Sequence, residues 1–429
     1  MEVKIGRPAV HAKGDVEAFP HRATFRRSMM LRFLLPAFVL PTPLPASDWP
    51  NWRGPNYDGI STEIIPATLP EELPIRWTAK VGTGFSTVSV ADEKVVTMGN
   101  RTVSEKETDT VWCLSAKTGK VIWQHSYPCA LDPLYYEGGP GATPTIHDGS
   151  VYTLSKKGHA LRLDLDNGKV IWSRDLVADH QVELPEWSFA GSPFIDGDRV
   201  LLNVGRGGIA LNKETGETIW LSSTETAGYA TVVPYEAGGP TANRLLFSAK
   251  GLIAFDPATG KAASELPWKS SRDVNAADPI VIGNRIIVSS ASGSVMIEPK
   301  AGGEPATIWE QKDMKWYFNP GVLIDGHLYS LHGTTHRPTE LMCLEAATGK
   351  IVWTVPGFGS GGVMAAGKTV IVFDNGLLTL FDADPKGYKA RHQQKILEGK
   401  CWTSPVIANG RIYCRNAVGD LACVELPES

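Results

Sequence analysis

The chain has 429 residues, of which 42% are hydrophobic and 21% charged, so it is long enough to bury a large core. Its formal net charge is −4, and no cluster of Lys and Arg forms a basic face, which argues against nucleic acid as a partner. The 43 glycines and 30 prolines are typical of many short strands joined by turns.

Residues 1–47 predict a leader that precedes the folded protein. Arg26, Arg27 and Arg32 come before the short apolar run 33–40, and small residues follow it. This order is typical of a secretory signal peptide, so we expect a soluble protein that is secreted or periplasmic. The run is shorter than the ~20 apolar residues of a membrane span, and prolines interrupt it. A disordered, proline-rich leader is the alternative.

Residues 48–73 form a lead-in segment between the leader and the repeats. It opens with Asp48-Trp-Pro-Asn-Trp-Arg-Gly-Pro-Asn-Tyr-Asp-Gly59. The sequence alone does not indicate what this segment does.

A ten-residue phrase that ends in tryptophan returns along the rest of the chain. Clear copies occupy 114–123, 163–172, 211–220 and 344–353, and looser ones end at Trp268 and Trp309. The tryptophans lie about 40 to 50 residues apart, which is the period of a four-stranded propeller blade. Before each copy comes a short apolar run and usually an Asp-Gly or Asn-Gly turn, the strongest short signal of a β-hairpin.

Counting these repeats predicts an all-β fold, a single eight-bladed β-propeller of four-stranded antiparallel blades over residues 74–429. The last repeat ends after three strands, and residues 74–80, with Trp77, have no preceding strands of their own. We therefore expect residues 74–80 to supply the outer strand of the last blade. Such a closure leaves no exposed sheet edge.

The Thr-Gly-Lys-x-x-Trp phrase resembles the tryptophan-docking repeat of PQQ-like (quinoprotein-type) β-propellers, which include the outer-membrane assembly factor BamB. The lead-in also looks like the opening of many secreted bacterial PQQ-like proteins. The resemblance covers residues 74–429 and implies that the repeat tryptophans wedge between neighbouring blades. This interpretation covers Trp77, Trp123, Trp172, Trp220, Trp268, Trp309 and Trp353. The repeat that begins at Phe381 lacks its tryptophan.

Residues that lead into the first strand of each blade surround one mouth of the central channel. Aromatic rings with a few carboxylates and amides suit a ligand with apolar faces and polar edges, such as a sugar, a quinone or a peptide. The alternative is that these rings only plug the channel. The candidate ligand-binding residues are Tyr135, Glu137, Trp187, Tyr229, Asn275, Asp278, Trp316, Asn319 and Trp402.

Two functions remain open. The preferred hypothesis is a monomeric, non-catalytic binding or scaffold propeller for a protein or carbohydrate, with no assigned catalytic residue. The alternative, implied by the family, is a dehydrogenase for alcohols or sugars that uses PQQ and Ca²⁺. Glu137, Asn275 and Asp278 would then be oxygen ligands or base, with Trp316 as a stacking floor. The family's dehydrogenases typically carry two adjacent cysteines and are longer, whereas this sequence has no Cys-Cys pair.

The six cysteines suggest small buried side chains more than a disulfide framework or a metal site. Cys113, Cys343 and Cys423 occupy one position of the repeat. Cys414 is the exception, because a turn at 418–419 would bring it across the hairpin from Cys423. A disulfide between Cys414 and Cys423 is therefore expected if their side chains align. No metal site is predicted.

Overall fold

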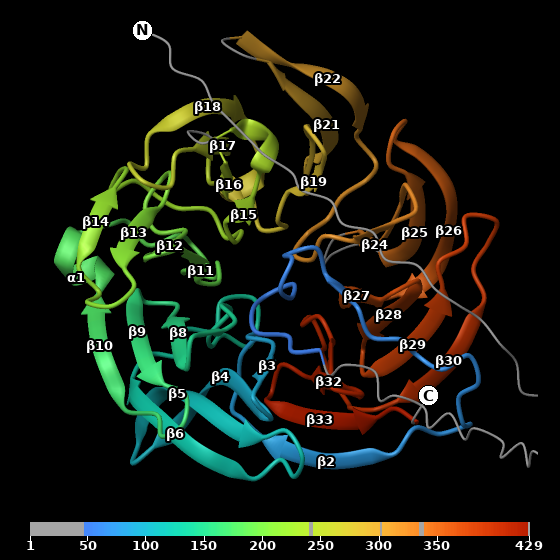
Figure 1. The fold of residues 1–429 in the computed structure, drawn as a ribbon, viewed down its shortest axis with the longest axis horizontal. Coiled ribbons are helices and arrows are strands. Elements are labelled where there is room, and N and C mark those ends of the chain that lie inside the picture. The colour runs from blue at the N-terminus through green and yellow to red at the C-terminus, as the bar shows by residue number, and fades with distance from the viewer. Residues whose placement is uncertain (1–46, 240–242, 301–302, 334–338, 428–429) are drawn as a thin grey trace, which may run out of the picture. The chain divides into compact units, whose positions relative to one another are not determined.

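Eight sheets surround a central axis in the computed structural model, which describes residues 47–239, 243–300, 303–333 and 339–427 (Figure 1). Each sheet is a blade whose antiparallel strands run, from the axis outward, as strands A, B, C and D. The predicted eight-bladed propeller is thus confirmed. The predicted signal peptide lies outside the described residues. No helix in the described ranges is long and apolar enough to cross a membrane.

The strands are, for blade 1, β3 (Ser89–Ala91), β4 (Lys94–Val103), β5 (Lys106–Ser115) and β6 (Val121–Pro128); for blade 2, β7 (Thr145–His147), β8 (Ser150–Leu154), β9 (His159–Asp164) and β10 (Val170–Asp175); for blade 3, β11 (Phe194–Asp196), β12 (Arg199–Leu202), β13 (Ile209–Asn212) and β14 (Thr218–Leu221); and for blade 4, β15 (Val233–Pro234), β16 (Arg244–Ser248), β17 (Gly251–Phe255) and β18 (Ala262–Pro267).

Blades 5 to 8 continue with β19 (Ile280–Ile282), β20 (Arg285–Ser290), β21 (Gly293–Lys300) and β22 (Gly303–Gln311); β23 (Val322–Ile324), β24 (His327–His332), β25 (Thr339–Glu345) and β26 (Lys350–Phe358); β27 (Gly362–Ala366), β28 (Thr369–Asp374), β29 (Leu377–Asp382) and β30 (Ala390–Lys395); and β31 (Val406–Ala408), β32 (Arg411–Arg415) and β33 (Asp420–Glu425). Three short helices lie in the connections, α1 (Leu176–His180), η1 (Glu236–Gly238) and η2 (Ser271–Asp273).

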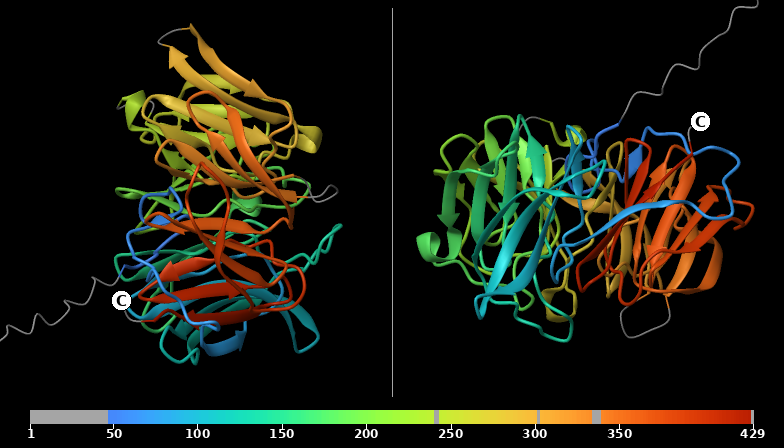
Figure 2. Two further views of the ribbon diagram at one scale, coloured as in Figure 1. Left: turned by 90° about the vertical axis from the view of Figure 1, so that its right-hand side faces the viewer. Right: turned by 90° about the horizontal axis from the view of Figure 1, so that it is seen from below.

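The ring closes as the sequence predicts. Strand β2 (Ile75–Lys80) pairs antiparallel with β33, with Trp77 opposite Cys423, and so becomes strand D of blade 8. The predicted hairpin turns also form. In the Asp148-Gly149 turn, for example, both residues have positive φ, as a type I′ turn requires. The A–B turns and both ends of the described chain share one face of the ring (Figure 2, right), which we call the A–B face. Loops from strand D to the next strand A lie on the opposite D–A face.

Tryptophan docking joins most neighbouring blades. Trp309 in blade 5 donates from Nε1 to the carbonyl of Ala346 in blade 6, at 2.9 Å. Its ring lies over Gly349, where a Cβ would come within 2.6 Å of the indole. Only glycine fits there, because this residue also has φ +71°. The same bond to the next blade is made by Trp77, Trp123, Trp172, Trp220 and Trp353.

Trp268 bonds to the next blade, as predicted, but does not hold the docking position. Blade 3 pairs Trp220 with Ala210, but the same position in blade 4 pairs Ser264 with Ala254. Trp268 follows four residues later, after β18 has ended, and its Nε1 donates to Ser290 Oγ at 2.9 Å. In blade 7, the buried His392 takes the docking position opposite Leu380.

The predicted disulfide is not formed. Cys423 lies opposite Tyr413, and Cys414 lies opposite Ala422, so the two cysteines are offset by one residue. Side chains alternate between the faces of a sheet, so this offset places the two thiols on opposite faces. All six cysteines are free and buried. Burial raises the pKa of Cys113 to about 12, so this thiol stays protonated and acts as a small apolar side chain.

Candidate functional site

The lead-in fills part of the central channel, where its blue trace crosses the middle of the ring (Figure 1). Trp49 is 2% exposed and exchanges two backbone hydrogen bonds of 2.8 Å with Val90 of β3. The carbonyl of Pro50 accepts from Ile146 N of β7 at 2.7 Å. Further on, strand β1 (Ile60–Ser61) pairs in parallel with β27, which makes blade 7 five-stranded. Residues 49–61 therefore form a channel plug.

Arg53 anchors this plug to blade 6. Its guanidinium donates to the carbonyls of Asp58 at 2.7 Å, Gly321 at 3.0 Å and Pro320 at 3.3 Å. Burial lowers the pKa of Arg53, and the charges of Asp278 and Asp58 oppose that shift. A charged side chain is stable in this interior only because its donors are used and a carboxylate is nearby.

Asp278 holds the plug to blades 4 and 5. Its Oδ2 accepts from Trp52 Nε1 at 2.5 Å, and its Oδ1 accepts from the backbone N–H of Thr231 at 2.7 Å. Burial raises the pKa of Asp278 to about 6, and the Arg53 charge limits the rise. Both carboxylate oxygens therefore serve the fold, which corrects the expectation that Asp278 lines an open mouth.

A row of half-buried aromatic rings lies on the D–A face. Neighbouring ring centroids are separated by 5.5 Å from Tyr136 to Phe85, 5.5 Å from Phe85 to Trp402, 5.3 Å from Trp402 to Phe318, and 4.5 Å from Phe318 to Tyr317. The rings come from loops that lead into strands A of four different blades. We call these five residues the aromatic row. The sequence analysis did not single out Phe85 or Phe318 as ligand candidates, although each aromatic ring shortly precedes a strand A.

An ion pair borders the aromatic row. Lys400 Nζ lies 2.9 Å from Glu137 Oε2 and 4.3 Å from the centre of the Trp402 ring. The lysine thus links the predicted candidates Glu137 and Trp402, and its charge faces a ring that attracts cations.

A second group of candidates surrounds Arg272. Its guanidinium lies 5.9 Å from the Trp187 ring centre, and its Nη1 lies 2.7 Å from Glu186 Oε1. Trp187 also contacts Tyr229 edge-on, with ring centroids 6.3 Å apart. Burial raises the pKa of Tyr229 to about 12, so its hydroxyl stays protonated. Tyr135 is 81% exposed and has φ +61°, a conformation that bulky residues rarely adopt.

Three other candidates prove to be structural. Trp316 has no exposed surface, and its Nε1 donates to Ser330 Oγ at 3.0 Å within the core. Asn275 is likewise fully buried, and its amide donates to the carbonyl of Ser248 at 2.8 Å. Asn319 donates to the carbonyl of Trp402 at 3.0 Å, so it positions the aromatic row.

The residues proposed to hold PQQ and Ca²⁺ do not fit that role. Glu137 is paired with Lys400, and both oxygens of Asp278 accept hydrogen bonds from the protein. Trp316 is buried in the core and cannot serve as a stacking floor. In the described part of the chain, no three His, Cys, Asp or Glu side chains converge as metal ligands.

Closed blades joined by docked tryptophans define a propeller of the PQQ-like class. The profile of the family described as outer membrane protein assembly factor BamB matches residues 74–184 and 108–355, and the chain belongs to this family.

Curated relatives match over part of their length. BamB of Salmonella typhimurium is 29% identical over 24% of this chain and 25% of its own. BamB of Yersinia pestis is 24% identical over 55% of this chain and 56% of its own. The chain thus spans about a quarter to just over half of the length of these two relatives.

Solved structures share the fold at low identity. BamB from Moraxella catarrhalis has a TM-score of 0.59 and 16% identity, covering 83% of this chain and 99% of the other. Quinohemoprotein alcohol dehydrogenase from Comamonas testosteroni has a TM-score of 0.66 and 13% identity, covering 89% of this chain and 81% of the other. At these identities, both comparisons establish the fold alone.

Proposed function

We propose that this protein is a non-catalytic scaffold propeller that recognises a partner protein through its D–A face. The observation that carries the proposal is the aromatic row with its bordering ion pair of Lys400 and Glu137. Aromatic side chains and arginine are enriched where proteins bind one another, and such residues contribute most of the binding energy. Arg272 and Trp187 extend the same face with both residue types.

The packing of this face favours a protein over a small molecule. Small ligands need a concave site that encloses them, whereas neighbouring rings of the aromatic row pack against one another. Four large apolar side chains in loops of this face are also exposed, Leu134 at 38%, Tyr135 at 81%, Leu184 at 38% and Val418 at 59%. Exposed apolar groups around half-buried rings are typical of an interaction surface.

The relatives support the same conclusion, because their name describes an assembly factor for outer membrane proteins. A role in a secreted or periplasmic location is part of the proposal. A glycan is the second candidate, since the faces of Trp402 and Trp187 could stack on sugar rings. The dehydrogenase alternative gains no support from the residues, because its proposed ligands serve the fold.

Substitution of Trp402 with alanine is expected to weaken partner binding at least ten-fold, because it removes the central ring of the row. Random 12-residue peptides would be selected by display on the purified wild-type protein. Fluorescence anisotropy would then measure the binding of the selected peptides to each variant. Tyr388→Ala is the matched control, because Tyr388 is a half-buried aromatic residue on the outside of blade 7.

The comparison uses selected peptides that still bind a Val281→Trp variant, because this change fills the cavity in the central channel. Equal affinity of Trp402→Ala and wild type for those peptides would contradict the proposed site. An oligosaccharide array run on the same two variants and the wild type separates the glycan candidate from the protein. If the wild type binds a sugar saturably, Trp402→Ala abolishes that binding and display selects no peptide, then the partner is a glycan and not a protein.

A further inference from the structure

In each blade with a two-residue A–B turn, one residue of strand A points its backbone N–H and C=O toward the channel. The residue directly before the turn hydrogen-bonds to strand B, so the residue one position earlier, such as Val90 in blade 1, points its backbone groups away from strand B. Ile146, Ile195, Val281, Leu323, Ala365 and Ile407 hold the same place in their blades.

The plug supplies backbone partners for three of these positions. Val90 exchanges bonds with Trp49, and Ile146 N donates to Pro50 O. The Ala365 N–H donates to Gly59 O at 2.9 Å. The plug therefore acts as an added strand in three of the blades, and it shows that these inner edges accept an extended chain.

Four of these positions, Ile195, Val281, Leu323 and Ile407, receive no backbone partner from the described residues of the plug. Two of them line the same cavity, Val281 in β19 and Leu323 in β23, and both are half-buried on edge strands of their sheets. Unpaired backbone groups in such a place need a partner from water or from another chain.

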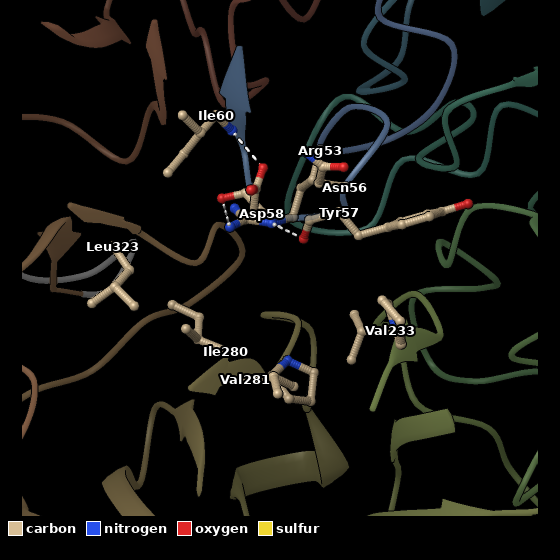
Figure 3. Close-up of a pocket in the computed structure, with 11 residues that line it drawn as sticks. Arg53, Asn56, Tyr57, Asp58, Ile60, Val233, Ile280, Val281 and Leu323 are labelled. Carbon is tan, nitrogen blue, oxygen red and sulfur yellow. Dashed lines mark hydrogen bonds between the residues drawn. The ribbon is translucent and has the colours of Figure 1, made fainter. Parts of the chain in front are cut away.

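A cavity of about 240 Å³ separates these two positions from the plug (Figure 3). Val281 and Leu323 line it together with Ile280, Val233 and Ile60, which form an aliphatic side, and Arg53, Asn56, Tyr57 and Asp58 of the plug form a polar side. Asp58 also lines it and is exposed, with its Oδ1 accepting from Ile60 N at 2.9 Å. The cavity does not include any residue of the aromatic row.

We propose that this cavity binds an extended peptide segment of a partner protein, which pairs with the backbone of Val281 and Leu323. A peptide carbonyl accepts from the Val281 N–H, as Pro50 and Gly59 do for blades 2 and 7. Small or β-branched apolar side chains fit the aliphatic side of the cavity, and polar side chains beside them meet the polar side formed by the plug. The occupant is therefore a short β-strand that alternates apolar and polar residues, and the site is independent of the aromatic row.

The test uses the full chain and the synthetic peptide acetyl-Val-Thr-Val-Thr-Val-Lys-amide, with binding measured by calorimetry. Saturable binding is expected, together with slower hydrogen exchange at the Val281 amide. The same peptide N-methylated at alternate residues should not bind, because it cannot donate to the strand edge. Val281→Trp should weaken binding at least ten-fold by filling the cavity. Ile64→Trp is the matched control, because Ile64 is 60% exposed and does not line the cavity.

Three results would overturn the proposal. One is no saturable binding up to millimolar peptide. Another is undiminished binding by a Val281→Trp variant that retains the wild-type melting temperature. The third is binding only after residues 1–46 are removed, which would assign the cavity to this chain's own N-terminal segment. Peptide binding that is lost in Val281→Trp but kept in Trp402→Ala supports this site, even if the proposed partner site on the D–A face is disproved.

Discussion

Replacing Arg415 with alanine is expected to destabilise the propeller by about 3–5 kcal/mol, because several buried acceptors would lose their donors. Arg415 is 2% exposed in β32 of blade 8. Its guanidinium donates to Met98 O at 2.6 Å, Thr97 Oγ1 at 2.9 Å and Gly82 O at 3.0 Å. These acceptors belong to blade 1 or the segment before it, so the side chain joins the last blade to the first.

The charge of Arg415 is retained at neutral pH, because burial lowers its pKa only to about 9. Alanine would leave several buried acceptors without donors, each at a cost of about 1–3 kcal/mol. Urea denaturation followed by circular dichroism measures the change in the free energy of unfolding. Arg76→Ala is the control, because Arg76 pairs with Glu425 at 3.3 Å across the same closing strands but is exposed. The control should lose about 1 kcal/mol or less. Equal losses in the two variants would contradict this role of Arg415.

Substituting Trp309 with alanine is expected to cost about 3–5 kcal/mol, as for other large-to-small changes of buried aromatic residues. The ring is 8% exposed, covers Gly349 and bonds to Ala346 in the next blade. Trp268→Ala should cost clearly less, because Trp268 is half-buried and is not in the docking position. Thermal and urea unfolding of both variants provide the measurement. The docking assignment is wrong if Trp268→Ala is the more damaging change.

The blade count and the ring closure were predictable because the repeats carry their own turn and docking signals. Register was less predictable, as Trp268 and Cys414 show. A prediction from the spacing of tryptophans assumes loops of equal length in every blade. In blade 4, however, Ser264 occupies the docking position. The Cys414 prediction failed by one residue, and one residue is enough to move a side chain to the other face of a sheet.

The candidate site was harder to predict, because loops have no periodicity that tells inside from outside. Trp316 and Phe318 are two residues apart, yet the first is in the core and the second lies in the aromatic row. The plug depends on contacts between residues far apart in the sequence, such as Trp52 with Asp278, 226 residues away. Nothing local in the lead-in indicates those partners.

The central claim is that the plug occupies part of the channel and that the polar residues there serve the fold, which leaves no site for PQQ and Ca²⁺. The most direct measurement titrates the purified full chain with PQQ and Ca²⁺ and follows tryptophan fluorescence and the visible spectrum of the cofactor. We predict no saturable change at high micromolar PQQ. Tight, stoichiometric binding that EDTA reverses would contradict the account and favour a quinoprotein dehydrogenase.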